Sequence, residues 1–159
     1  MKIELKNLKH SKWASQETDC FHADVWINGK RAGQVSNHGQ GAANDYSPWE
    51  LAETLNEYAA TLAPTTYEIG GKTHTIPEDA DSIISRAFVA KLHERDLRRM
   101  LANRVIYVDR EGKLMQTKTT TKQAMSKILE MPNLFERLNA TKILNFLSID
   151  EALSIYARS

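Results

Sequence analysis

The side chains best suited to bind a ligand lie between Ser36 and Ser47, in the segment Ser-Asn-His-Gly-Gln-Gly-Ala-Ala-Asn-Asp-Tyr-Ser. Its two glycines, Gly39 and Gly41, allow the backbone to approach a ligand closely. A helix predicted to follow from Pro48 would add unpaired N–H groups and the positive end of its dipole, which attract anions. The segment therefore predicts a site for a phosphate or nucleotide-like anion. The residues expected to line it are Asn37, His38, Gly39, Gly41, Asn44, Asp45, Tyr46 and Ser47.

The same segment also has an explanation that needs no ligand. Glycines between a strand and a helix permit the turns that such a connection requires. The segment lacks the lysine that follows the glycines of a phosphate-binding P-loop. The sequence leaves both explanations open, and a thermal-shift test with a panel of nucleotides would separate them.

A row of basic residues forms a second candidate site. Lys91, Arg95, Arg98 and Arg99 lie on a predicted helix and fall within about 100° of its circumference. Arginine side chains in such a row can bind phosphates or the carboxylates of a partner. Three explanations stay open: a surface for a partner protein, a surface for nucleic acid, and a solvated face that pairs with acidic residues of the same chain.

Charge is divided unevenly along the sequence. Between Ala43 and Ser82 there are eight acidic residues and one basic residue, Lys72. Between Ile83 and Lys127 there are eleven basic and four acidic residues. Such a division is typical of a basic face for an acidic partner, and equally of two halves of one fold that pair with each other.

No arrangement typical of catalysis or metal binding stands out in the sequence. His22 and Asp24 are two residues apart on a predicted strand and so share a face. Cys20 is the single cysteine, and no HxxxH, HxH or CxxC pair occurs. We therefore predict no catalytic residue, no metal site and no cofactor. An enzyme that uses His38 with Asp45 or Asp24 is the least supported hypothesis.

Two elements are expected to position the first candidate site. A β-hairpin is predicted over 21–36, because apolar residues alternate along its first arm and Asn28-Gly29 favours a type I′ turn. It is followed by a loop and by a helix over 48–63. Ser47 is the expected N-cap of that helix, and Glu50 completes a capping box.

The rest of the chain mixes hairpins with helices. The fold class predicted is α+β, in which antiparallel hairpins form a sheet packed against three to four helices in a single domain over 1–159. The other expected elements are a strand over 2–8, a hairpin over 67–76, a helix over 78–103, a hairpin over 105–118, a helix over 121–131, a strand over 142–146 and a short final helix with a capping box at Ser148 and Glu151.

Composition restricts the class of protein. Hydrophobic residues at 42% and charged residues at 26% are typical of a folded globular domain. No apolar run approaches the roughly 18 residues of a membrane helix, and residues 2–8 alternate instead of forming the apolar core of a signal peptide. A single cysteine leaves no internal disulfide. We therefore expect a cytoplasmic protein with no membrane partner.

Two stretches carry a resemblance to a known group. The first runs from Asn28-Gly-Lys30 through Gly-Gln-Val-Ser-Asn-His-Gly-Gln-Gly to Asn44-Asp-Tyr46, and the second joins Ile143-Leu-Asn145 to Asp150-Glu-Ala-Leu153. Over residues 1–60 and 140–157 the chain resembles small uncharacterised accessory proteins encoded by bacteriophages, prophages and plasmids. It has Gly41-Ala42 where that group would have a pair of glycines. The resemblance implies no activity and no catalytic residues, but it does imply an origin in a mobile element.

Accessory proteins of mobile elements often bind and block host defence machinery. The resemblance and the basic row together predict a non-enzymatic binding protein that occludes a host protein or nucleoprotein complex. The partner would contact the basic row, or the acidic helix over 48–63 acting as a phosphate mimic. The alternative is capture of a nucleotide or another anion by residues 36–47, and direct binding of nucleic acid is a weaker one. The oligomeric state stays open.

Overall fold

The computed structural model describes residues 1–158. Its internal contacts divide the chain into two compact units, Met1–Lys91 and a second unit from Leu92 onward. The boundary falls within one long helix, α2 (Ala80–Asn103). The prediction of a single domain over 1–159 stays a prediction.

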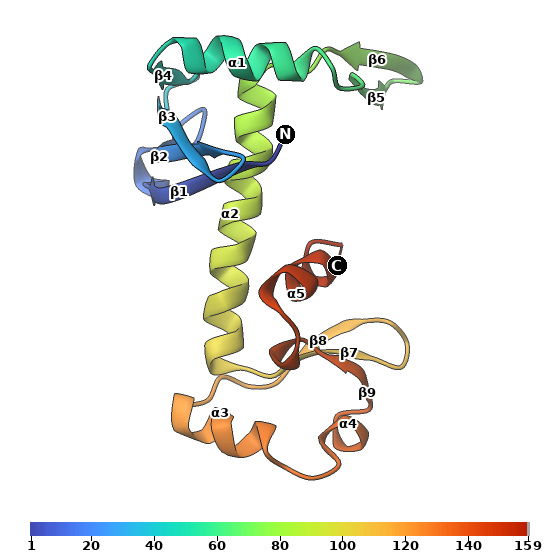
Figure 1. Ribbon diagram of the computed structural model, residues 1–159. Helices are drawn as coiled ribbons and strands as arrows, with labels where there is room; N and C mark the ends of the chain where they lie inside the picture. Colours follow the sequence, from blue (N-terminus) through green and yellow to red (C-terminus); the bar gives the residue numbers. More distant parts are fainter. Residues whose placement is uncertain (159) are drawn as a thin grey trace. The chain divides into compact units, whose positions relative to one another are not determined.

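The first unit contains a sheet of four strands within the described residues, in the order β1-β2-β3-β4 (Figure 1). Every neighbouring pair is antiparallel. The strands are β1 (Ile3–His10), β2 (Cys20–Ile27), β3 (Lys30–His38) and β4 (Asp45–Ser47), with a short 3₁₀ helix, η1 (Lys12–Ala14), after β1.

The predicted hairpin is confirmed as β2 and β3. Asn28 and Gly29 form its turn with φ angles of 49° and 81°, as a type I′ turn requires. The pairing register shifts between Val25 and Trp26, which marks a bulge opposite these residues. Gly33 lies beside this shift, and a Cβ atom there would lie 2.5 Å from the Ser47 carbonyl oxygen.

The core of the first unit combines the sheet with two helices, α1 (Glu50–Ala59) and the first part of α2. Phe21 of β2 packs against Phe88 of α2, with ring centroids 4.7 Å apart. Asn56 of α1 accepts a hydrogen bond from the Ala80 N–H at the start of α2. The buried apolar residues of this unit are Leu5, Phe21, Ala23, Val25, Val35, Leu51, Leu55, Ala59, Ala80, Ile83, Ile84 and Phe88.

A two-stranded hairpin, β5 (Thr65–Ile69) and β6 (Lys72–Ile76), separates α1 from α2 and matches the predicted element over 67–76 (Figure 1). Every residue of both strands is exposed. Tyr67 stacks on His74, with ring centroids 5.4 Å apart. The hairpin therefore contributes exposed surface to the first unit and none of its buried core.

The second unit is built on a sheet with strand order β8-β7-β9, counted over the part of the chain that the structure describes. Its pairs are antiparallel. The elements after α2 are β7 (Ile106–Asp109), β8 (Leu114–Gln116), α3 (Lys122–Leu129), α4 (Leu134–Arg137), β9 (Ala140–Ile143), η2 (Leu144–Phe146) and α5 (Ile149–Tyr156).

Both faces of this sheet are covered, because successive residues near β7 point to opposite sides. Val105 and Tyr107 pack with Met125 of α3 and Leu134 of α4. Ile106 belongs to a second cluster, which includes Leu97 of α2, Leu144 of η2 and Ala152 of α5. Burial on both faces explains why the 105–108 run is continuously apolar.

The fold class is α+β with antiparallel sheets, as predicted. The capping box at Ser148 and Glu151 is also confirmed, and hydrogen bonds from Ser148 lower the pKa of Glu151. The strand predicted over 142–146 is wrong in part, because β9 ends at Ile143 and a 3₁₀ turn follows. None of the helices in residues 1–158 has the length and apolar composition of a membrane span.

Candidate binding surfaces

The segment predicted to bind an anion is largely strand. Asn37 and His38 close β3, and β4 begins at Asp45, so only residues 39–44 connect the two strands. The prediction of a loop over 37–46 is therefore wrong at both ends. The physical reason is pairing between β4 and β3, which a local pattern does not reveal.

Helix α1 does not begin as predicted. Its first residue is Glu50, and its N-cap is Trp49, whose side chain makes no capping hydrogen bond. Ser47 is not the cap because it belongs to β4, where it pairs with Gln34. A strand therefore separates the 39–44 connection from the N-terminus of α1, whose dipole was expected to attract an anion.

Asn37 is buried, and both the oxygen and the nitrogen of its side-chain amide form hydrogen bonds within the chain. Its Oδ1 accepts hydrogen bonds from Thr18 Oγ1 at 2.8 Å and from the Gly39 N–H at 2.8 Å. Its Nδ2 donates to the Ala42 carbonyl at 3.0 Å and to Asn44 Oδ1 at 3.1 Å. Asn37 thus holds the shape of the connection between β3 and β4.

The carboxylate of Asp81, in the first turn of α2, accepts three hydrogen bonds from Asn44 and Tyr46. Its Oδ1 accepts hydrogen bonds from the Tyr46 hydroxyl at 2.6 Å and from Asn44 Nδ2 at 2.9 Å. Its Oδ2 accepts the Asn44 N–H at 3.3 Å. Burial and the bond to Asp81 raise the pKa of Tyr46, so its phenol stays protonated and donating. The chain itself supplies a carboxylate where the sequence predicted an external anion.

The two glycines are required by packing within the first unit. Gly39 and Gly41 have φ angles of +82° and +81°, which favour glycine. The Gly39 carbonyl accepts hydrogen bonds from the Gln16 and Glu17 N–H groups, each at 3.0 Å. A Cβ atom at Gly39 would lie 2.3 Å from the Ala14 carbonyl oxygen. These contacts support the explanation of the segment that needs no ligand.

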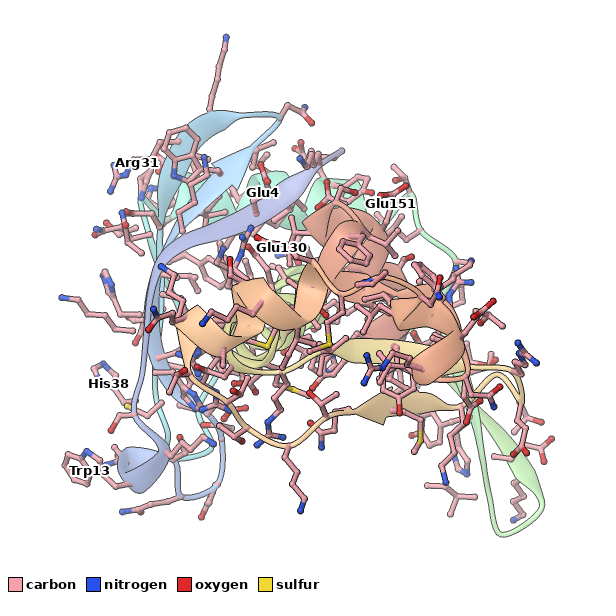
Figure 2. All side chains as sticks on the ribbon, turned by 90° about the horizontal axis from the view of Figure 1, so that it is seen from below. Glu4, Trp13, Arg31, His38, Glu130 and Glu151 are labelled. Atoms are coloured by element: carbon pink, nitrogen blue, oxygen red, sulfur yellow. The ribbon has the colours of Figure 1, made fainter. Side chains whose placement is uncertain are left out.

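His38, Asp45 and Ser47, the other predicted ligand residues, are exposed. His38 Nε2 lies 3.6 Å from Asp45 Oδ2. Figure 2 shows His38 and Trp13 projecting outward from the ribbon. This solvated pair has no third polar partner in residues 1–158 that would orient it for catalysis.

Asp24, the other carboxylate considered for catalysis, is held in a hydrogen-bonded network on one face of the sheet. Asn7 Nδ2 donates to its Oδ2 at 2.7 Å, and Arg31 Nη2 donates to its Oδ1 at 2.9 Å. Gln34 Nε2 also donates to Oδ1, at 3.2 Å. The hydrogen bond from Asn7, followed by those from Arg31 and Gln34, lowers the pKa of Asp24 to about 2. A carboxylate held this firmly in its ionised form is a poor general base.

This network predicts how stability depends on pH. The pKa of Asp24 is near 2 when folded and about 3.9 when unfolded, so its contribution is complete above the unfolded value. It is lost as the pH falls through the folded value. We therefore expect Asp24→Asn to destabilise the protein at neutral pH and to differ progressively less from the natural protein below about pH 4. Urea unfolding at a series of pH values measures the difference, and a pH-independent difference would contradict the network.

The predicted basic row is present on α2, although it is partly ion-paired. Arg98 Nε lies 2.8 Å from Glu94 Oε1, and Arg99 Nη2 lies 3.2 Å from Asp96 Oδ1. Arg95 is exposed and has no ion pair with any residue in 1–158. Lys91 belongs to the first unit, whereas the three arginines belong to the second.

The structure adds residues that the sequence analysis did not connect with this row. The segment Thr117–Lys122 lies against the C-terminal end of α2, where the Thr120 N–H donates to the Asn103 carbonyl at 2.9 Å. Arg104 Nε donates to Thr119 Oγ1 at 3.0 Å. In the sequence, a lysine near each end of this threonine-rich segment was the feature that could have linked it to the basic row. We use the name basic surface for the basic residues of the second unit that lie on α2, directly after it, or in the segment that is hydrogen-bonded to its end: Arg95, Arg98, Arg99, Arg104, Lys118 and Lys122.

Two other exposed features stand out in the first unit. On α1, Glu50, Glu53 and Glu57 are exposed and form no ion pair among the described residues. In the hairpin of β5 and β6, Ile69 is 62% exposed and Ile76 is 52% exposed. The pairing register places Ile69 beside the turn and Ile76 at the opposite end of the hairpin.

Nothing in residues 1–158 groups three or more His, Cys, Asp or Glu side chains in an arrangement that could hold a metal ion. Cys20 is a free, half-buried thiol in β2. Comparison with protein-family models, with curated proteins and with solved structures finds no match for this chain.

Proposed function

We propose that this chain is a non-enzymatic binding protein that holds an acidic partner protein on its basic surface and occludes it. The observation that carries the proposal is the position of Thr117–Lys122 against the end of α2. This position supports grouping Lys118, Lys122 and Arg104 with the arginines of the helix. The resemblance to accessory proteins of bacteriophages, prophages and plasmids supports a host protein or nucleoprotein complex as the partner, and an anti-defence role.

The charges of the second unit favour an anionic partner. From Leu92 to the end of the sequence there are twelve lysines and arginines and eight acidic residues. Within residues 1–158, Arg98 and Arg99 are the members of the basic surface that form ion pairs. Exposed pairs on one helix contribute less than about 1 kcal/mol each, so a partner's carboxylates can replace them.

A protein partner fits this surface better than nucleic acid does. Glu94 and Asp96 lie among the arginines of α2, and a phosphate backbone would be repelled by both carboxylates. A partner protein with mixed charges can instead place lysines against them. Nucleic-acid binding also needs a broader basic footprint than six residues usually provide.

Reversing three charges of the basic surface tests the proposal. We expect Arg95→Glu, Arg98→Glu and Arg99→Glu together to weaken partner binding about 100-fold, because each arginine loses a charge-assisted contact and gains a repulsive one. The partner is first captured from host lysate on the immobilised protein, identified by mass spectrometry and purified. Its dissociation constant is then measured by calorimetry with the natural protein and with the variant.

A matched variant controls for net charge. Arg110, Lys113 and Arg137 are exposed, belong to the same unit and lie outside the basic surface, so their reversal to glutamate should leave affinity within about threefold. Circular dichroism checks that both variants fold. Equal weakening by the two variants would mean that net charge, and not this surface, determines binding. Tight binding of purified DNA or RNA by the natural protein, lost in the first variant alone, would replace the protein partner with nucleic acid.

A further inference from the structure

A cavity of about 280 Å³ opens in the first unit beside the connection between β3 and β4. Its inner lining includes Phe21 of β2 and Phe88 of α2. Asp19 and Asp81 contribute carboxylates to the lining, and Val89 of α2 contributes an exposed apolar side chain. Sequences far apart in the chain meet here, which is why no local motif marks the cavity.

The charge of this cavity is negative. Asp19 and Asp81 are the charged side chains among its lining residues, and no lysine, arginine or histidine lines it. Asp81 is half-buried and forms no ion pair within residues 1–158, although Tyr46 and Asn44 donate hydrogen bonds to it. These neutral donors and the start of α2 compensate its charge only in part. An anion placed here would meet two carboxylates, whereas a cation would pair with them.

The aromatic part of the lining also suits a cation. Phe21 is 8% exposed and Phe88 is 3% exposed, and their rings are tilted by 34° to each other. The face of an aromatic ring attracts an ammonium group through its quadrupole, and the effect grows when water is excluded. The same rings offer apolar contact to an alkyl chain. Carboxylates beside buried phenyl rings therefore match a cationic head on an apolar stem.

A buried histidine packs against two of the lining residues. The His10 side chain is 4% exposed, and its Nε2 lies 3.1 Å from Asp19 Oδ1. Its ring meets Phe88 edge-on at a centroid distance of 5.1 Å. Nδ1 of the same ring has no hydrogen-bond partner in the described chain. His10 is not itself among the residues that line the cavity, but it contacts two of them, Asp19 and Phe88, from behind the lining.

We infer that this cavity binds an alkylammonium group, with the nitrogen between the carboxylates and the alkyl chain against the phenyl rings. A free diamine or polyamine and the lysine side chain of a peptide present the same chemistry. The volume is near the lower limit of small-molecule pockets, about 300 Å³, so a single amine with a short chain would fill it. The inference is independent of the basic surface, which belongs to the other unit.

Calorimetry and thermal unfolding of the full chain test the inference. The probes are 1,4-diaminobutane and Nα-acetyl-lysine methylamide, with 1-butanol as the neutral analogue and ATP as an anion. We expect at least one amine to bind and to raise the melting temperature, and neither 1-butanol nor ATP to do so. Binding of the diamine alone assigns a free amine as the ligand, and binding of the lysine derivative alone assigns a peptide side chain.

Two variants locate the binding. Asp81→Asn keeps the size of the side chain and should weaken amine binding at least about tenfold by removing a charge. Val89→Lys changes an exposed residue at the lining and brings an ammonium group of its own, so it should also abolish binding even if Asp81→Asn folds poorly. Asp45→Asn, which removes a carboxylate outside the cavity, is the matched control and should bind as the natural protein does. Failure of both amines, unchanged binding in Val89→Lys, or stabilisation by ATP alone would overturn the inference.

Discussion

Replacing Gly39 with alanine is expected to destabilise the first unit by about 3 kcal/mol. The residue has a φ of +82°, which costs an alanine roughly 1–2 kcal/mol. Its new Cβ would also lie 2.3 Å from the Ala14 carbonyl oxygen and 2.9 Å from the Cβ of Cys20. The backbone of two loops would therefore have to separate. All three tryptophans, Trp13, Trp26 and Trp49, lie in this unit, so urea unfolding followed by tryptophan fluorescence measures the change.

Gly29 provides the matched control for this substitution. Its φ is +81°, almost the same as that of Gly39, but within residues 1–158 no atom beyond its two chain neighbours lies within 4 Å of the position that a Cβ would take. Gly29→Ala should therefore cost only the conformational part, about 1–2 kcal/mol. The excess in Gly39→Ala is the cost of close packing between the loops. Equal destabilisation by the two variants would show that the loop before β2 does not pack against Gly39.

Local patterns predicted the elements whose signals are complete within a few residues. Asn28-Gly29 determines its turn because both residues accept positive φ angles at little cost. Ser148 and Glu151 close a capping box within one helical turn. The short strand β4 was missed because three residues carry no readable alternation, and its pairing with β3 spans a loop. Ser47 is therefore a residue of β4, although Pro48 and Glu50 after it favour Ser47 as the N-cap of a helix.

The candidate sites were less predictable, because their chemistry depends on residues that are distant in sequence. Asn44 and Asp81 are 37 positions apart, yet Asn44 donates two hydrogen bonds to the Asp81 carboxylate, which takes the position predicted for an external anion. The row on α2 was correctly placed on one helix, since a spacing of three and four residues fixes it. Its extension by Lys118 could not be read from spacing, because that lysine follows β8 in the chain.

Asn145→Ala is expected to destabilise the second unit by about 3 kcal/mol. The Asn145 side chain joins three backbone groups: its Oδ1 accepts the Ile106 N–H at 2.9 Å, and its Nδ2 donates to the Leu101 and Arg104 carbonyls at 3.1 and 3.0 Å. It thus connects η2 to the end of α2 and the start of β7. Alanine leaves one donor and two acceptors without partners, at about 1 kcal/mol each. Hydrogen exchange at the Ile106 amide reports the loss directly.

Asn103→Ala is the control variant. It separates the loss of the three hydrogen bonds of Asn145 from the general effect of removing an asparagine side chain. Within residues 1–158, Asn103 makes one side-chain hydrogen bond, from its Nδ2 to the Arg99 carbonyl at 3.1 Å, and its removal should cost less than about 1 kcal/mol. Asn145→Asp retains the acceptor for Ile106 but loses both donors, so protection of that amide should persist better than in Asn145→Ala. If Ile106 exchanged equally fast in the alanine and aspartate variants, the bond to its N–H would not be what protects it. If it exchanged no faster in either than in the natural protein, Asn145 would not connect these three elements.

The hydrogen bonds of Asn145 matter for the proposed function because one of them is accepted by the carbonyl of Arg104, a residue of the basic surface. The guanidinium of Arg104 in turn contacts Thr119, in the segment that carries Lys118 and Lys122.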